Sequence, residues 1–144
     1  MIVNPSPISP EFLQADLACD TLIANEHEAV VLTGMKLSDF EAKPENALGV
    51  ARCRQLIITC GGKPTLAIAA GQTYRVAPPK VTPVDTVGAG DAFAGAFAVA
   101  QAGGFSLEEA VRFANAAGAL ATQKIGAQSS IPMREEIVSS MREQ

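Results

Sequence analysis

The 144-residue chain has little aromatic character, with no tryptophan, one tyrosine and six phenylalanines. Hydrophobic residues nevertheless make up 48% of the sequence. The core must therefore be built mainly from Ala, Val, Ile and Leu, which favours a parallel sheet covered by helices. The length is enough for one domain with a buried core.

The sequence also lacks clustered positive charge and long apolar runs. The net charge is −4 and the eleven Lys and Arg residues are scattered, which argues against a nucleic-acid partner. The longest weakly polar run, residues 92–104, is shorter than the ~20 residues that cross a bilayer, so we expect no membrane partner. No signal-peptide pattern opens the sequence. These absences predict a cytoplasmic location.

Cysteines are few and odd in number. Cys19, Cys53 and Cys60 show no C-x-x-C spacing. We therefore expect reduced, partly buried thiols rather than metal ligands or disulfides.

Apolar runs and turn residues predict strands that alternate with helices, and hence an α/β layered fold formed by a single domain. A buried strand is expected at residues 1–3. The other expected strands are 21–24, 55–60, 65–70 and 73–77, the last two as a hairpin. Helices are expected at 10–17, 25–33, 36–54 with a break near Pro44, 91–102, 106–124, and from 132 onward.

A glycine-rich stretch, V-D-T-V-G-A-G-D-A-F-A-G-A-F, spans residues 84–97. The backbone N–H groups of Gly88, Ala89 and Gly90 can converge on one anion at the start of a helix. Asp91 follows in the first turn, where a carboxylate can take a proton from an attacking hydroxyl. The alternative is that Asp91 only caps the helix and the glycines only form a tight turn. The third glycine of a dinucleotide-binding fingerprint is absent.

The segment D-T-V-G-A-G-D, residues 85–91, resembles the C-terminal signature of the ribokinase-like (PfkB) sugar kinases. Residues 25–28, N-E-H-E, resemble the N-x-x-E motif of the same family, and residues 113–121 and 126–137 are also similar to it. The resemblance covers essentially the whole chain. It implies a layered α/β/α sheet and ATP-dependent phosphorylation of a sugar's primary hydroxyl, with a ribose-like acceptor as the first candidate.

The resemblance also implies roles for particular residues. Asp91 would be the catalytic base, and the amides of Gly88, Ala89 and Gly90 the anion hole for the γ-phosphate. Asn25 and Glu28 would organise Mg²⁺ and its water ligands. The alternative for this pair is a helix N-cap with its capping-box partner, and both roles are compatible.

The nucleotide and a monovalent cation, K⁺ in this family, would use further residues. Thr59, Gly61 and Gly62 would meet the ribose and phosphates of ATP. Asn115 would line the adenine pocket, or alternatively be a buried polar side chain satisfied by backbone. The cation site would comprise Asp85, Val87, Ala121, Lys124 through its carbonyl, Gly126 and Ser130. An ordinary turn would equally explain the small residues there, and Asp85 could simply end a strand. Glu135 and Glu136 are expected only to complement the dipole of the last helix.

The family fold is considerably longer than this chain. We therefore expect residues 1–144 to be the C-terminal portion of a kinase domain, without the N-terminal sugar-binding half and lid. Such a chain would form a homo-oligomer or pair with a complementary N-terminal half. The alternative is a catalytically inactive fragment that acts as an association module through an exposed sheet edge.

Overall fold

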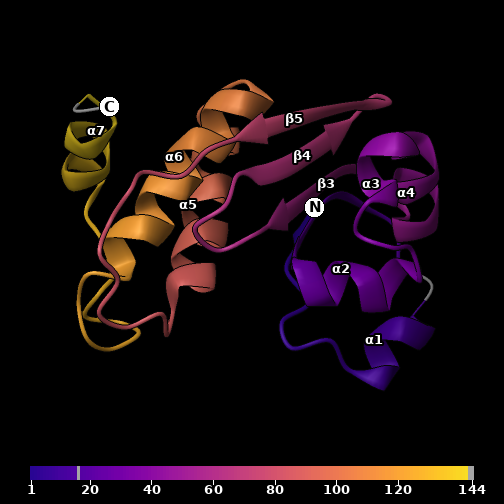
Figure 1. Ribbon diagram of the computed structural model, residues 1–144, viewed down its shortest axis with the longest axis horizontal. Helices are drawn as coiled ribbons and strands as arrows, with labels where there is room; N and C mark the ends of the chain where they lie inside the picture. Colours follow the sequence, from indigo (N-terminus) through magenta and orange to yellow (C-terminus); the bar gives the residue numbers. More distant parts are fainter. Residues whose placement is uncertain (16, 143–144) are drawn as a thin grey trace. The chain divides into compact units, whose positions relative to one another are not determined.

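The computed structural model describes residues 1–15 and 17–142. The chain divides into two compact units, Met1–Arg75 and Val76–Gln144 (Figure 1). In the part of the chain that is described, no helix is long and apolar enough to cross a membrane.

The first unit is built on a five-stranded sheet with the strand order β1-β2-β3-β4-β5. β1, β2 and β3 pair in parallel, whereas β3 and β4 pair antiparallel. The expected parallel sheet is therefore confirmed only for the first three strands. The link between β3 and β4, residues 60–64, is too short for the crossover that a parallel pair requires. The strands are Ile2–Val3, Cys19–Asn25, Cys53–Thr59, Thr65–Ala69 and Gln72–Val76.

Leaving residue 16 aside, four helices accompany this sheet, and their bounds are Pro10–Gln14 for α1, Glu26–Thr33 for α2, Asp39–Ala42 for α3 and Pro44–Ala51 for α4. Arg52 ends α4 in a left-handed conformation with φ +53°, and β3 begins at the next residue. The helix expected over residues 36–54 therefore ends three residues earlier than predicted, at Ala51. Apolar side chains of α2, α3 and α4 pack on alternate residues of β2, β3 and β4. This core comprises Leu22, Ala24, Ala29, Phe40, Ala47, Leu48, Ala51, Leu56, Ile58, Leu66 and Ile68.

The strand at the start of the chain is present but is not buried. Ile2 is 37% exposed and Val3 is only partly covered. β1 is the last strand on its side of the sheet and has β2 as its partner. The prediction of a buried strand at 1–3 was wrong because it assumed neighbours on both sides.

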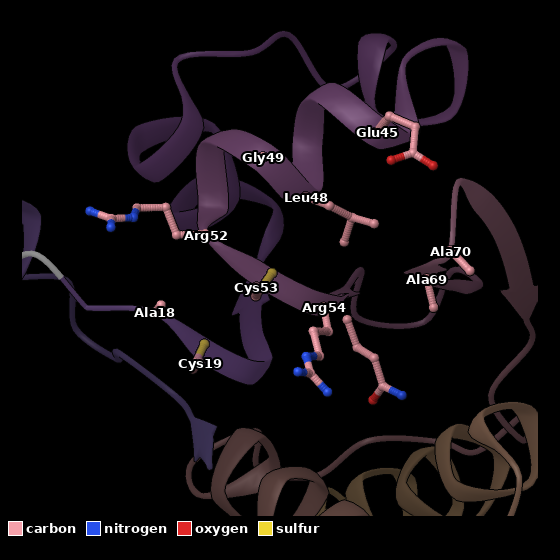
Figure 2. A pocket seen from close by; sticks show the side chains of 11 residues that line it. Ala18, Cys19, Glu45, Leu48, Gly49, Arg52, Cys53, Arg54, Ala69 and Ala70 are labelled. Atoms are coloured by element: carbon pink, nitrogen blue, oxygen red, sulfur yellow. The ribbon is translucent and has the colours of Figure 1, made fainter.

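The three cysteines are free thiols in the structure, and their side chains are partly buried, as predicted. Cys19 begins β2, Cys53 begins β3, and both line an open pocket of about 840 Å³ in the first unit (Figure 2).

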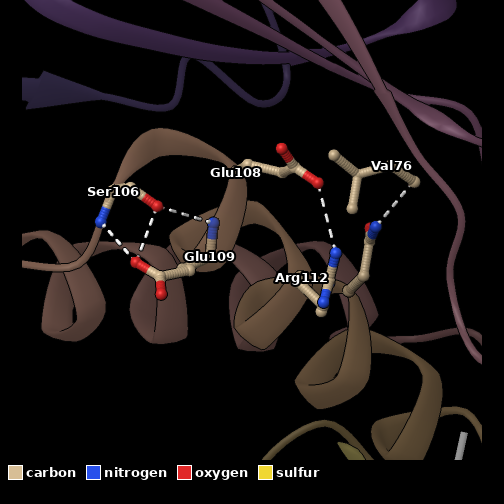
Figure 3. A network of polar contacts seen from close by, with 6 residues as sticks. Val76, Ser106, Glu108, Glu109 and Arg112 are labelled. Atoms are coloured by element: carbon tan, nitrogen blue, oxygen red, sulfur yellow. Dashed lines mark hydrogen bonds and ion pairs between the residues drawn. The ribbon is translucent and has the colours of Figure 1, made fainter.

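The described part of the second unit contains three helices, α5 at Ala89–Ala102, α6 at Leu107–Ala121 and α7 at Arg134–Arg142. α6 begins with the expected capping box, in which the Glu109 N–H donates to Ser106 Oγ and the Ser106 N–H donates to Glu109 Oε2 at 2.9 Å (Figure 3). α5 and α6 pack closely, since a Cβ on Gly118 would lie 3.3 Å from the carbonyl oxygen of Ala89. α5 begins two residues earlier than predicted, because Gly88 rather than Gly90 ends the preceding turn.

Candidate active site

The first candidate functional element is the N-terminal end of α5. Gly88 is the N-cap residue and has a left-handed backbone with φ +81°. Asp91 therefore occupies the third helical position, in the first turn, and its side chain is exposed. Among the described residues no group forms a hydrogen bond or ion pair with the Asp91 carboxylate. The Ala89 N–H donates to the Thr86 carbonyl at 3.3 Å, so one of the three expected amides already takes part in the turn.

Gly88 is also in close contact with a later segment of the chain. A Cβ built on Gly88 would lie 3.0 Å from Cα of Ala127 and 3.1 Å from its carbonyl oxygen. By contrast, a Cβ on Gly90 would meet no atom within 4 Å. Gly88 is thus required by backbone conformation and by packing, whereas Gly90 leaves open space beside the helix end.

Asp85 joins the glycine turn to that later segment. Its Oδ1 accepts from the Val87 N–H at 3.0 Å and its Oδ2 accepts from the Gly126 N–H at 3.1 Å. The N–H groups of Val84 and Asp85 both donate to the Thr122 carbonyl. The hydrogen bond from Val87, followed by that from Gly126, lowers the pKa of Asp85 below its usual value. The structure therefore brings together three of the residues expected at the monovalent-cation site.

The other residues expected at that site lie nearby in sequence but have different partners. Ser130 is fully buried and its Oγ donates to the Ala127 carbonyl at 3.1 Å. The Lys124 N–H donates to the Ala121 carbonyl at 3.4 Å. No hydrogen bond within the described residues joins Ala121, Lys124 or Ser130 to Asp85.

Glu136 has a larger role than sequence reasoning assigned to it. Its Oε2 accepts from the Met133 N–H at 2.6 Å and its Oε1 accepts from Nζ of Lys124 at 3.1 Å. The hydrogen bond from Met133, and then that from Lys124, lowers the pKa of Glu136. The spacing of three residues between Met133 and Glu136 is that of a capping box. It was missed because methionine cannot return the side-chain hydrogen bond that defines the pattern.

In the first unit, Asn25 and Glu28 form the capping box of α2. Oδ1 of Asn25 accepts from the Glu28 N–H at 2.8 Å, and Oε2 of Glu28 accepts from the Asn25 N–H at 2.9 Å. The remaining oxygen, Oε1, accepts from Ser6 Oγ at 2.6 Å. Glu28 is only 7% exposed, whereas Asn25 is exposed.

This arrangement fits Mg²⁺ held through water rather than by Glu28 directly. Both carboxylate oxygens of Glu28 already accept hydrogen bonds, and no group of three or more His, Cys, Asp or Glu side chains among the described residues could hold a metal. Magnesium keeps several water ligands in proteins, so an exposed amide backed by a buried carboxylate is compatible with it.

Asn25 and Thr59 are register partners at the carboxyl ends of β2 and β3. Ligands of open α/β sheets bind beyond these ends. Immediately after Thr59, residues 60–63 form a turn in which Gly61 has φ +59° and the Lys63 N–H donates to the Cys60 carbonyl at 3.0 Å. The structure thus brings the expected magnesium and ribose-phosphate residues of this unit to one edge of the sheet.

Asn115 lies in the second unit and is 5% exposed. Its Nδ2 donates to the Val76 carbonyl at 2.9 Å (Figure 3). This is the backbone-satisfied arrangement that the sequence left open as an alternative.

The structure resembles solved sugar kinases of the ribokinase fold. The ribokinase of Thermotoga maritima superimposes with a TM-score of 0.82 at 35% identity, over 98% of this chain and 48% of that one. The ribokinase of Arabidopsis thaliana, solved with ribose and ATP, gives a TM-score of 0.80 at 34% identity, over 98% of this chain and 47% of that one.

The family description of the pfkB family carbohydrate kinases matches residues 1–134, and the chain belongs to this family. Curated relatives include the ribokinase of Haemophilus influenzae, 35% identical over 141 residues, and that of Bacillus subtilis, 38% identical over 138 residues. These alignments cover 94% and 95% of this chain, but 45% and 44% of the relatives. The chain therefore spans slightly less than half the length of these relatives.

Proposed function

We propose that this chain carries the nucleotide-binding portion and the catalytic base of an ATP-dependent kinase that phosphorylates the primary hydroxyl of a ribose-like sugar. The observation that carries the proposal is the start of α5, where Gly88 caps a 14-residue helix and Asp91 lies in the first turn with no hydrogen-bond or ion-pair partner among residues 1–15 and 17–142. Family membership and the ribokinase relatives support the substrate class.

In this proposal Asp91 acts as a general base. Its exposed carboxylate accepts the proton of the sugar hydroxyl as the oxygen attacks phosphorus. The N–H groups at the start of α5 point out of the helix end and stabilise negative charge on the phosphoryl oxygens, assisted by the helix dipole. Gly90, whose Cα faces open space, lets the phosphoryl group approach these amides.

The residues proposed to bind ATP belong partly to the first unit and partly to the second. Thr59, Gly61 and Gly62 follow β3 and would contact ribose and phosphates, while Asn115 would lie beside the adenine with its amide nitrogen still bonded to Val76.

Two cations are part of the same proposal. Mg²⁺ supplies neutralising charge to the ATP phosphates, and Asn25 and Glu28 would hold its water ligands. A monovalent cation, K⁺ by analogy, would be held by Asp85, Val87 and Gly126 together with Ala121, Lys124 and Ser130. The two amide donors on Asp85 leave each oxygen with further acceptor capacity for such an ion.

Residues 1–144 are then the C-terminal portion of one kinase domain. The sugar site would come from the region that the relatives have in addition, through pairing with a complementary N-terminal half. A homo-oligomer of residues 1–144 could form as well but would not supply that region. A cytoplasmic location stays a prediction. The association-module alternative has in its favour only the exposed edge strand β1, and we do not propose it.

The first test is a calorimetric titration of the 144-residue chain with MgATP in potassium buffer. We expect binding with a Kd of ~1–100 μM, corresponding to about −5 to −8 kcal/mol. Asp91→Asn should retain this binding, because the substitution removes a negative charge near the phosphates. Absence of binding to a chain shown to be folded by circular dichroism would contradict the nucleotide assignment.

The second test measures sugar-dependent ADP release after an N-terminal half is added in trans, for example that of the Bacillus subtilis ribokinase. Asp91→Asn should lower the rate by ~10²–10⁴-fold, the usual contribution of a general base. Asp39→Asn is a matched control, since Asp39 also lies in the first turn of a helix. Equal rates for both variants would exclude Asp91 as the base.

A further inference from the structure

Two of the three cysteines occupy adjacent positions in the sheet of the first unit. Cys19 and Cys53 are register partners in the parallel pair β2–β3. Neighbouring strands lie about 4.7–4.9 Å apart, and paired residues project from the same face of the sheet. Both thiols are free and partly buried. The two thiol groups, Cys19 and Cys53, are therefore neighbours on the sheet, and we call them the dithiol.

The two thiols pack against the edge of the hydrophobic core and also line a pocket. The pocket has a volume of about 840 Å³, and Figure 2 shows both sulfur atoms among the side chains that line it. Small and apolar residues line part of this pocket, namely Ala18, Leu48, Gly49, Ala69 and Ala70, and the rest of the lining is polar or charged, namely Glu45, Arg52, Arg54 and Gln55. A ligand can therefore reach both sulfur atoms without unfolding the sheet. Cys60, the third thiol, does not line this pocket.

The surroundings of the two thiols disfavour negative charge. Burial raises the pKa of Cys53 to about 12, and the neighbouring Cys19 adds to this effect. Burial also raises the pKa of Cys19. A ligand suited to this site should therefore bond to both sulfur atoms and leave no net charge on them.

We propose that Cys19 and Cys53 together form a capture site for trivalent arsenicals. With phenylarsine oxide, two As–S bonds form and two S–H bonds break. The oxygen on arsenic leaves as water with the two thiol protons. Arsenic stays trivalent, so no oxidant or reductant is needed, and the product is neutral. The site is independent of the kinase assignment.

The test treats the full chain with phenylarsine oxide and then with excess glutathione, a monothiol that removes arsenic held by one sulfur. Intact-mass spectrometry should show one retained arsenical per chain, which a small dithiol then removes. Alkylation with iodoacetamide before that small dithiol is added should label Cys60 alone. Cys19→Ser and Cys53→Ser should each lose the retained adduct, while the matched control Cys60→Ser should keep it.

The result that overturns the proposal is a folded wild-type chain with no glutathione-resistant adduct, or an adduct that protects Cys60. An adduct that persists in folded Cys19→Ser or Cys53→Ser would overturn it equally. If circular dichroism shows that a serine variant is unfolded, the alanine variant replaces it. Mapping of the alkylated cysteines in the wild type tests the same proposal without any variant.

Discussion

Gly126 donates its backbone N–H to Oδ2 of Asp85 at 3.1 Å, across 41 positions of sequence. The other oxygen of the same carboxylate accepts from Val87, within the glycine motif itself. One side chain thus holds the turn before α5 and the segment after α6 in a fixed relation. The aspartate that opens the family signature is therefore a structural element of the turn, whatever its part in binding a cation.

Asp85→Asn should lower the thermal midpoint at neutral pH, because an amide is a weaker acceptor and offers only one oxygen to two donors. The carboxylate has a folded pKa below its usual value of 3.8, so its stabilising contribution is present above that value and is lost as pH falls through the lower folded pKa. Urea midpoints from about pH 6 to about pH 3 should converge for the two proteins. A constant difference across this range would contradict the role of the charge.

Gly88→Ala and Gly90→Ala form a matched pair. Gly88→Ala should destabilise the chain by about 1–2 kcal/mol or more, because the new Cβ meets a left-handed backbone and the backbone of Ala127. Gly90→Ala should leave stability nearly unchanged and weaken MgATP binding, since its Cβ would occupy the space proposed for the phosphate. Denaturation and calorimetry on the same samples separate the two effects. Equal losses of stability in the two variants would contradict the open space that surrounds a Cβ on Gly90.

Asn25 can be tested for its two roles separately. Asn25→Ala should cost about 0.5–2 kcal/mol, because the cap of α2 is lost. Asn25→Asp keeps an acceptor for the Glu28 N–H and should restore most of this stability. The Mg²⁺ dependence of nucleotide binding is then measured for the stable Asn25→Asp variant. A change there reflects the role of Asn25 at the metal, because the helix cap is intact.

Asn115→Leu should destabilise the chain by about 1–3 kcal/mol, because the Val76 carbonyl loses its side-chain donor in a buried position. Asn46→Leu, at an exposed position of α4, is the control and should change little. Chemical denaturation measures both. A neutral Asn115→Leu would mean that water replaces the lost donor.

The raised pKa of Cys53 predicts that the protein loses stability at alkaline pH. Its thiol is expected to ionise near 9.0 in the unfolded chain and near 12 in the folded one. The stabilisation is therefore complete below about pH 9 and is lost as pH rises toward the folded pKa. Urea midpoints of the wild type should fall more steeply above about pH 9 than those of Cys53→Ala. Parallel curves would contradict the burial of this thiol.

Local sequence patterns predicted the helix ends well where a capping residue and its partner are enough to define the end. Asn25 with Glu28, Gly34, and Ser106 with Glu109 all mark helix ends as expected, because each signal acts within four residues. The start of α5 was misplaced by two residues, since the glycine that adopts the left-handed conformation cannot be identified from G-A-G alone.

The family resemblance placed Asp85 and Gly126 at one site, but the individual contacts between distant residues could not be predicted from the sequence. Nothing in the spacing of Asp85 and Gly126 predicts their hydrogen bond, and Glu136 was assigned a dipole role because its partner Lys124 belongs to another segment. The pairing of Cys19 with Cys53 depends on strand register, which the apolar runs do not fix. Asn25 and Thr59 likewise meet only through the order of the strands.

The contact between Gly88 and Ala127, together with the two hydrogen bonds on Asp85, has a kinetic consequence. The amides at the start of α5 are already ordered before any anion arrives, so little conformational entropy is lost when one binds. Association of nucleotide with this end of the molecule should then proceed in a single exponential phase whose rate rises linearly with nucleotide concentration, without a plateau from a slow loop rearrangement.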